Sequence, residues 1–531
     1  MLAPTWTRAE HCRRLSEVPS FDVVVIGGGV IGCGVALDLT TRGFQVALVE
    51  QADWASGTSG RSTKLFHGGI RYLPHFRFQL VAEGLREQRV LARIADYLFQ
   101  TLEFVVPVYD QHGLADAPAW AARGRRASIA LGAGLTLYDL LGGFNRPGER
   151  HRRLRLSEVL SAAPLLRTEG LRGGFAYSDA QTDDARLVIA LARTAVRYGC
   201  TAVNRMQALR VEPAEAEFGV DLVDMMNGEP LRLRARAVVA ATGAFRPPAL
   251  GDRAQARFVL SKGAHLILAA ESVGLADRAI VLPKTDDGRV LFLIPWAGHA
   301  LVGTTDTAYD GSPAGPVATA DDVGYLLDHV RRYLGVNSLD PVSTFAGLRA
   351  LADDDADSTA EASREHVITE PQPGYLVVTG GKLTTYRRIA AEVADSITRS
   401  LDSKSKSRTK NVLLVGAGAG GLPRAGGLFH RYGSETASVE NILSEVDIGN
   451  TLLGDGVTFL GEVGQAVRHE SAVSIGDFAL RRTRLSLLSS DHGREDASLI
   501  ARAMQTELGW SQTERDRQLS AFHSELEAEG L

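Results

Sequence analysis

The most constraining feature of the sequence is a glycine-rich turn between two apolar runs near its start. Phe21–Ile26 is a short β-branched run, typical of a strand buried in a parallel sheet. The turn that follows has the spacing GxGxxG, with its glycines at Gly27, Gly29 and Gly32. Residues 33–42 are compatible with a helix, and a second strand-like run then ends in Glu50. This order predicts a βαβ unit that binds a dinucleotide.

Each part of this unit has a chemical role. The glycines let the backbone approach a pyrophosphate, the start of the helix supplies partial positive charge, and Glu50 accepts a hydrogen bond from a ribose hydroxyl. An acid at this point disfavours a 2′-phosphate, and therefore NADP. A second match to the spacing, at residues 416–421, is followed by Pro423 and lacks a second strand. We interpret that match as a turn between domains.

Composition excludes several other classes of protein. The 531 residues allow about three domains, and 45% hydrophobic with 23% charged residues is typical of a globular chain. A net charge of −5 and the lack of a basic, aromatic stripe give no reason to expect nucleic acid. Three scattered cysteines and no metal-binding motif predict no metal site. With neither a secretory signal nor a membrane-spanning run, we expect a cytoplasmic protein.

Three later segments indicate a cofactor larger than NAD. Residues 54–73 are dense in glycine and small hydroxyl residues, and a strand-like run at 238–243 ends in Thr242 and Gly243. Residues 380–387 end a third strand and open a helix, whose N–H groups can face an anion. A cofactor contacted along so much of the chain must be large, so FAD fits better than NAD.

The motifs, taken together, resemble one family. The chain contains VVVIGGGVIGCGVALDLTTRGFQVALVE, GTSGRSTKLFHGGIRYL, YSDAQTDDARL, IPW, GTTD and GGKLTTYR in that order. They closely resemble FAD-dependent glycerol-3-phosphate dehydrogenases, and RRTRL (481–485) resembles part of that family's C-terminal domain. The resemblance implies an α/β fold with a Rossmann-like FAD-binding domain of the glutathione-reductase or D-amino-acid-oxidase type. It also implies a sheet-containing substrate domain and an all-α C-terminal domain.

The domains implied by the resemblance are interleaved along the chain. We expect a discontinuous FAD-binding domain made of residues 1–80, 166–250 and 345–400. A substrate domain is expected to comprise residues 81–165 and 251–344. Residues 401–411 are polar and cationic and predict a linker, and residues 412–531 predict the helical C-terminal domain.

The resemblance also implies the reaction and its residues. Hydride transfer from C2 of sn-glycerol 3-phosphate to FAD would give dihydroxyacetone phosphate, with electrons passed to quinone. Arg71 and Arg349 are expected to bind the phosphate, with Tyr72 as a hydroxyl partner. The residues expected to act in catalysis are His67 as the first candidate base, His265 as the second, and Lys382 as a positive charge near the reacting hydroxyl or the reduced flavin. The residues expected to contact FAD are Gly27, Gly29, Gly32, Glu50, Thr58, Ser59, Ser62, Lys64, Leu65, Thr242, Gly243, Gly381, Leu383 and Thr384.

Three other functions are compatible with this cofactor. They are a glycerol-3-phosphate oxidase that uses oxygen, an enzyme that oxidises another hydroxy acid or an amine, and a non-catalytic flavin redox sensor. A sensor would need neither paired arginines nor a base beside the flavin, so Arg71, Arg349 and His67 argue against it.

A membrane surface is a further expected partner. Arginines flank the largely apolar residues 127–144, which is the pattern of an interfacial anchor on the cytoplasmic face of a membrane. A buried helix with solvated arginines around it would give the same pattern. The remaining expected partners are glycerol 3-phosphate, quinone and a second copy of the chain.

Overall fold

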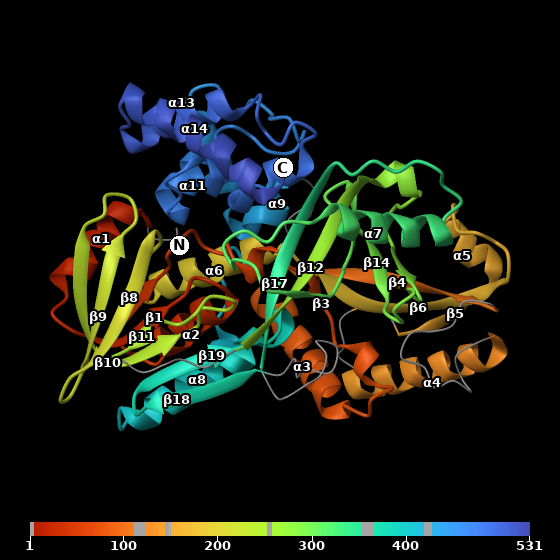
Figure 1. The fold of residues 1–531 in the computed structure, drawn as a ribbon, viewed down its shortest axis with the longest axis horizontal. Helices are drawn as coiled ribbons and strands as arrows, with labels where there is room; N and C mark the ends of the chain where they lie inside the picture. The colour runs from red at the N-terminus through yellow and green to blue at the C-terminus, as the bar shows by residue number, and fades with distance from the viewer. Residues whose placement is uncertain are drawn as a thin grey trace.

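The computed structural model describes residues 5–110, 124–143, 148, 150–251, 258–352, 366–418 and 427–531. Its strands form two sheets that lie side by side, and the C-terminal helices pack over the first sheet and the junction (Figure 1). This arrangement confirms the predicted α/β fold with a helical C-terminal part.

The first sheet carries the predicted βαβ unit. Among the described residues it has nine strands: β1 (Phe21–Ile26), β2 (Val46–Val49), β7 (Thr201–Val203), β8 (Met206–Pro213), β9 (Phe218–Asp224), β10 (Pro230–Ala240), β11 (Ala249–Leu250), β18 (Val367–Gln372) and β19 (Tyr375–Thr379). β10 pairs in parallel with both β1 and β19. The carboxyl ends of these three strands therefore meet at one edge, which brings together three of the segments predicted to bind the cofactor.

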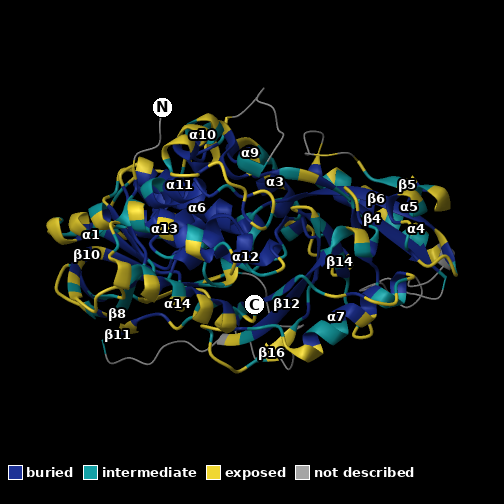
Figure 2. Ribbon diagram, turned by 90° about the horizontal axis from the view of Figure 1, so that it is seen from above, coloured by how far each residue is buried: buried dark blue, intermediate teal, exposed yellow. Residues whose placement is uncertain are grey.

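Three helices pack beside this sheet: α2 (Val30–Thr41), α6 (Asp184–Arg197) and α8 (Tyr386–Ser400). α2 is buried along almost its whole length because it lies between α6 and α8 as well as against the sheet. α6 is equally buried and lies at the centre of the molecule (Figure 2). α2 is an apolar helix without a polar face, and such a helix is stable only in a buried position.

The second sheet is larger and has helices on both faces. Among the described residues its ten strands are β3 (Leu65–Phe66), β4 (Gln100–Tyr109), β5 (Arg152–Leu154), β6 (Leu171–Gln181), β12 (Phe258–Ala269), β13 (Ala279–Leu282), β14 (Leu291–Trp296), β15 (His299–Gly303), β16 (Thr307–Tyr309) and β17 (Ser343–Ala352). α4 (Gly124–Gly142) covers one face and α7 (Ala320–Tyr333) the other (Figure 1). Separate apolar cores lie under the two helices. α3 (Phe78–Ile94) and α5 (Leu156–Ala162) complete this part of the chain.

Two parts of this sheet differ from the sequence-based expectation. The sequence pattern of residues 76–165 predicts mainly helix, but β4 lies at the centre of the sheet between β13 and β6. A short apolar run such as that of β4 cannot be distinguished from a buried helix by periodicity. β6 and β17 were expected in the FAD-binding domain, yet they pair with β4 and β12 in the second sheet. The second sheet therefore includes β6 and β17 as well as the strands of the expected substrate domain.

The C-terminal helices have a core of their own. They are α9 (Gly427–Tyr432), α10 (Thr436–Glu445), α11 (Glu462–Glu470), the π-helical turn η8 (Asp477–Arg482), α12 (Leu485–Leu488), α13 (Ala497–Leu508) and α14 (Gln512–Glu529). Phe478, Ile500 and Phe522 are buried at the centre of this domain. The polar segment 401–411 packs against α2, where Ser407 and Thr409 both donate to the Asp38 carboxylate.

The N-terminal helix α1 (Arg8–Glu17) packs on β7 at the edge of the first sheet. Within the described parts of the chain, no helix is both long and apolar enough to cross a membrane.

Candidate active site

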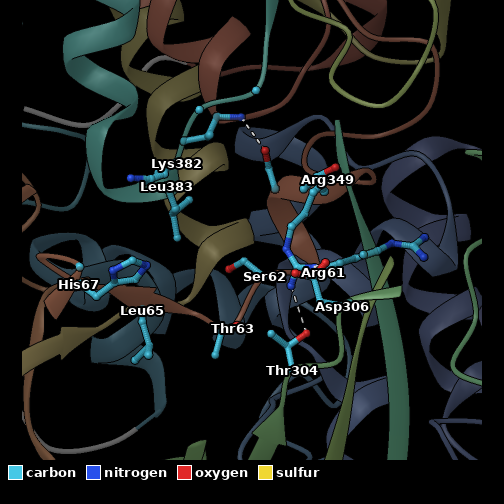
Figure 3. Close-up of a pocket in the computed structure, with 18 of the residues that line it drawn as sticks. Arg61, Ser62, Thr63, Leu65, His67, Thr304, Asp306, Arg349, Lys382 and Leu383 are labelled. Carbon is cyan, nitrogen blue, oxygen red and sulfur yellow. Dashed lines mark hydrogen bonds and ion pairs between the residues drawn. The ribbon is translucent and has the colours of Figure 1, made fainter. Parts of the chain in front are cut away.

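A cavity of about 870 Å³ begins at the carboxyl edge of the first sheet and continues between the second sheet and α4. Its two ends, here called the glycine end and the cationic end, have different chemistry. The glycine end is lined by the turn after β1 and by Glu50, and the cationic end by Arg71, Lys382 and Arg349. Figure 3 shows His67 and Arg349 on opposite sides of the cavity, with Ser62 and Thr63 between them.

The glycine end is a close contact between backbone segments. Gly27 has φ +117°, a conformation that L side chains rarely adopt, and a Cβ there would lie 2.4 Å from the Ala241 carbonyl oxygen. A Cβ on Gly32 would lie 1.9 Å from the Gly27 carbonyl oxygen, so Gly32 lets α2 pack against the turn. These glycines leave the N-terminus of α2 directed at the cavity. Such a cradle fits the pyrophosphate of FAD.

Glu50 lies beside this cradle and is hydrogen bonded to backbone. Its carboxylate accepts from the Gly28 amide at 2.6 Å and from the Ala52 amide at 2.8 Å. Burial raises the pKa of Glu50, while the two amide hydrogen bonds oppose the rise. Ser59 also reaches this end, because its Oγ accepts from the Val30 amide in the first turn of α2. Glu50 therefore lies where a ribose hydroxyl beside the pyrophosphate would need an acceptor.

The cationic end joins two turns that are far apart in sequence. The Thr384 hydroxyl accepts from the His67 amide at 3.1 Å, which ties the turn after β19 to the turn after β3. Lys382 Nζ lies 4.1 Å from the centre of the Tyr72 ring, and the Arg71 guanidinium lies 5.3 Å from the same centre. Burial alone would raise the pKa of Tyr72, but Arg71 and Lys382 outweigh it and lower the pKa. Positive charge is thus concentrated around this ring.

Both candidate histidines are neutral at physiological pH. Burial, with the charges of Arg71 and Lys382, lowers the pKa of His67 to about 3. Burial, Arg349 and Lys64 hold the pKa of His265 well below its usual value. His265 Nε2 lies 2.9 Å from the Thr63 hydroxyl, and its ring stacks on Phe345. The pKa of His67 therefore lies well below the value of about 6.5 that an unperturbed imidazole has.

Arg349 reaches the cavity from β17. Its Nη1 lies 3.2 Å from Asp306 Oδ1, and its Nη2 donates to the Thr304 hydroxyl at 3.2 Å (Figure 3). A Cβ on Gly263 would lie 2.4 Å from Arg349 Nη2, so the adjacent strand β12 leaves room for the guanidinium only because it has glycine at this position. The guanidinium is thereby held in one orientation.

Most of the predicted site residues line this one cavity. They are Gly27, Gly29, Glu50, Thr58, Ser59, Ser62, Leu65, His67, Arg71, Tyr72, Thr242, Gly243, His265, Arg349, Gly381, Lys382 and Leu383. Gly32, Lys64 and Thr384 are not among the lining residues. Gly32 packs α2 and Thr384 holds His67, as described above. Lys64 is fully buried in an ion pair with Asp184 at 2.8 Å, so its side chain points into the protein.

Several lining residues were missed by the sequence analysis. Thr304 and Asp306 belong to the GTTD motif, which was noted without a role, and Arg61 belongs to the motif GTSGRSTK. An apolar arm of the cavity was also missed. It is lined by Leu131, Leu135 and Leu137 of α4, by Phe76 and Phe78, and by Phe104, Val106 and Phe292 of the second sheet. Phe104 and Val106 lie two residues apart on β4, so they point to the same face of the sheet. This signal could be used only if β4 were recognised as a strand.

Comparison with known proteins agrees with this geometry. Residues 22–395 match a family described as "FAD dependent oxidoreductase", and residues 407–515 match the "C-terminal domain of alpha-glycerophosphate oxidase". Glycerol-3-phosphate dehydrogenase 2 of Mycobacterium tuberculosis is 35% identical, with 99% of this chain and 91% of that protein covered. The chain belongs to the FAD-dependent glycerol-3-phosphate dehydrogenase family. The predicted family and its FAD cofactor are thus confirmed.

Other members of the family extend the comparison. The aerobic glycerol-3-phosphate dehydrogenase of Staphylococcus aureus is 34% identical over 78% of this chain and 74% of that protein. The structure of the Bacillus halodurans glycerol-3-phosphate dehydrogenase complexed with FAD has a TM-score of 0.76 and 26% identity, covering 98% of this chain and 97% of that chain. The L-α-glycerophosphate oxidase of Mycoplasma pneumoniae shares the fold, with a TM-score of 0.58 at 17% identity over 74% of this chain and 97% of that chain.

Proposed function

We propose that this chain oxidises sn-glycerol 3-phosphate to dihydroxyacetone phosphate. The observation that carries the proposal is a set of cations at one end of a cavity whose other end fits FAD. Among the described residues, neither Arg71 nor Lys382 forms an ion pair with a carboxylate, although both face the cavity. Cations that are left uncompensated in a cavity favour an anionic ligand, and a phosphate dianion matches their number.

The chain's residues can orient such a substrate. Arg349 is fixed by Asp306 and Thr304, so it offers a rigid fork to phosphate oxygens, while Arg71 and Lys382 add charge from the turns after β3 and β19. The same positive charges stabilise negative charge that develops on the C2 oxygen as its proton leaves. FAD, when bound, supplies an acceptor for the hydride from C2.

The proton of the C2 hydroxyl needs an acceptor in the same place. His67 and His265 are both neutral, so each ring offers a lone pair to a hydroxyl proton. Nδ1 of His265 is buried, so a substrate hydroxyl would have to share Nε2, which lies 2.9 Å from the Thr63 hydroxyl. A bound phosphate dianion would raise the pKa of either imidazole by offsetting the neighbouring cations, so the substrate itself would strengthen the base.

A visible spectrum tests the proposed reaction. We expect the flavin bands of the anaerobic, FAD-loaded protein to bleach on addition of sn-glycerol 3-phosphate and to remain unchanged with glycerol. Glycerol lacks the charge that the cations bind, so it serves as the matched control. Bands that persist with sn-glycerol 3-phosphate would contradict the proposal, whereas bleaching by glycerol alone would contradict the role of the cations.

We further propose that electrons leave for a quinone through the apolar arm of the cavity. Leucines of α4 and the rings of Phe76 and Phe78 line the arm, and such walls suit an apolar ring better than a charged acceptor. Reoxidation of the reduced protein by a soluble quinone should be much faster than by dissolved oxygen. Faster reoxidation by oxygen would instead assign an oxidase.

The same arm opens beside exposed apolar side chains, from which we propose contact with a membrane surface at the cytoplasmic face. Phe76 is 78% exposed, Leu140 is 73% exposed and Ile129 is 64% exposed. α4 is only partly available for this contact, since Leu135 and Tyr138 of the same helix are buried. Leu140→Ser, at a position that does not line the cavity, should weaken binding to anionic vesicles at low salt without changing turnover of the soluble protein. Equal vesicle binding by Leu140→Ser and wild type would contradict this contact.

A further inference from the structure

The C-terminal domain reaches the wall of the cavity through a buried arginine. Arg484 has φ +69° and immediately precedes α12. Its guanidinium donates to the carboxylates of Asp183 and Asp184 at the start of α6, and its Nη1 donates to the Gly60 carbonyl at 3.3 Å. Gly60 belongs to residues 58–65, here called the wall segment. Arg484 therefore contacts the wall segment both directly and through Asp184.

Asp184 also contacts Ser62 and Lys64 of the wall segment. Its carboxylate accepts from the Ser62 amide at 2.9 Å, from the Ser62 hydroxyl at 2.7 Å and from Lys64 Nζ at 2.8 Å. Lys64 has φ +60°, a left-handed conformation that costs a non-glycine residue on the order of 1 kcal/mol. The ion pair with Asp184 holds Lys64 in this conformation, and the turn directs Ser62 and Leu65 toward the cavity.

A second contact comes from the last helix. Glu529 of α14 forms an ion pair with Arg61 Nη2 at 2.5 Å, and both side chains are largely buried. Arg61 Nη1 also donates to the Ala346 carbonyl of β17 at 3.4 Å. Arg484 precedes α12 and Glu529 ends α14, so the C-terminal domain holds the wall segment at two separate points.

The wall segment contacts both ends of the cavity. Ser59 accepts from the first turn of α2 at the glycine end, and Thr63 is hydrogen bonded to His265 at the cationic end. A movement of the wall segment would therefore change the cofactor cradle and the orientation of a candidate base together. Buried ion pairs contribute little net stability but are costly to break on one side, so they favour one geometry over its alternatives.

We propose that Arg484 and Glu529 are positioning residues, through which the C-terminal domain holds the wall segment in the shape that retains FAD and orients His265. Neither residue lines the cavity. The inference depends on the proposed function only for its turnover measurement, because FAD binding can be measured without a substrate.

The main test compares two arginines of the same domain. Arg484→Gln removes the contacts to Gly60 and to both aspartates. The control is Arg468→Gln, because Arg468 pairs with Glu507 and Glu445 inside the C-terminal domain. For each variant we would measure the FAD dissociation constant of the apoprotein, hydrogen–deuterium exchange of residues 58–65, and kcat and KM at saturating FAD.

We expect at least tenfold weaker FAD binding and faster exchange of residues 58–65 in Arg484→Gln. At saturating FAD, kcat should fall at least fivefold while KM for sn-glycerol 3-phosphate changes less than twofold, because the phosphate-binding cations do not contact Arg484. Arg484→Lys should recover part of the FAD affinity by restoring the charge. Arg468→Gln should lower the thermal midpoint alone.

A second pair of variants tests the proposal if Arg484→Gln does not fold. Glu529→Gln breaks the contact to Arg61, and Glu527→Gln, an exposed position two residues earlier, is its control. We expect about threefold weaker FAD binding for Glu529→Gln and unchanged FAD binding for Glu527→Gln. Unchanged FAD affinity and exchange in Arg484→Gln and Glu529→Gln, or equal changes in the controls, would overturn the proposal. A wild-type protein that binds FAD but is not reduced by substrate would overturn the proposed function instead.

Discussion

The glycine end and the cationic end of the cavity are built by different means. The glycine end is made of backbone from one βαβ unit, with Gly27 and Glu50 separated by a single helix and strand. The cationic end is made of side chains, and Arg71, Arg349 and Lys382 come from three segments on two sheets. A site made of backbone tolerates almost no substitution, because an added Cβ would overlap neighbouring backbone atoms. In a site made of side chains, a substitution removes only the contacts of one residue.

The largest effect is expected from a single methyl group at the glycine end. Gly27→Ala places a Cβ 2.4 Å from the Ala241 carbonyl oxygen at φ +117°. We therefore expect the free energy of unfolding to fall by roughly 3 kcal/mol or more, and the protein to lose all of its bound flavin. Gly29→Ala is the control, since its Cβ would meet only the Ser59 hydroxyl at 3.0 Å. Equal thermal midpoints of the two apoproteins would show that the backbone end is not rigid.

At the cationic end, removal of one charge should impair the reaction but keep the cofactor. Arg349→Gln should lower kcat/KM for sn-glycerol 3-phosphate roughly 30- to 150-fold, the loss of about 2 to 3 kcal/mol of charge-assisted hydrogen bonding. The flavin spectrum should be unchanged. Arg232→Gln, whose side chain is 55% exposed on the first sheet, is the control. A decrease of less than threefold in Arg349→Gln would remove Arg349 from the substrate site.

A smaller effect is expected where a side chain supports the backbone end. Glu50→Gln keeps one acceptor oxygen but loses the charge that holds the Gly28 and Ala52 amides. We expect about tenfold weaker FAD binding, from roughly 1.4 kcal/mol, with the fold retained. Titration of the apoprotein with FAD measures this change. Unaltered affinity would mean that the glycine cradle alone determines FAD binding.

The smallest effect concerns the pH dependence of stability. Because the pKa of His67 is about 3 in the folded protein and about 6.5 when unfolded, the unfolded chain binds the extra proton between these values. The folded protein is therefore most stable with respect to this histidine above pH 6.5, and its free energy of unfolding decreases as the pH falls below that value. Between pH 7.0 and 5.5, wild type should lose roughly 1 kcal/mol more than His67→Asn. Parallel thermal midpoints of the two proteins over this range would contradict the low pKa.

How much the sequence predicts follows the same division. The βαβ unit could be predicted because its strand, turn and helix signals are local, and β19 was located correctly for the same reason. β4 was missed because burial on both faces removes the alternation that marks a strand. Arg61 could not be assigned, since its partner Glu529 is far away in the sequence and no local pattern specifies the pair.

Lys64 shows a different kind of difference. It stands in the motif GTSGRSTKLFHGGIRYL, and the family resemblance implied contact with the cofactor. The left-handed backbone at Lys64 turns the side chain inward, where Asp184 neutralises it. The sequence alone does not predict this direction of the side chain, because the direction depends on a turn that no propensity of lysine favours.

The order of the strands has a consequence for biosynthesis. The chain leaves the first sheet after β2, returns for β7 to β11, leaves again for β12 to β17, and comes back for β18 and β19. β1 emerges early from the ribosome, but its partner β10 and the adjoining β19 are made much later. β1 therefore stays unpaired on its β10 side, with apolar side chains exposed, until most of the chain has been synthesised. Chaperones that shield nascent apolar segments should consequently influence the yield of this protein more than that of an enzyme whose domains follow one another along the chain.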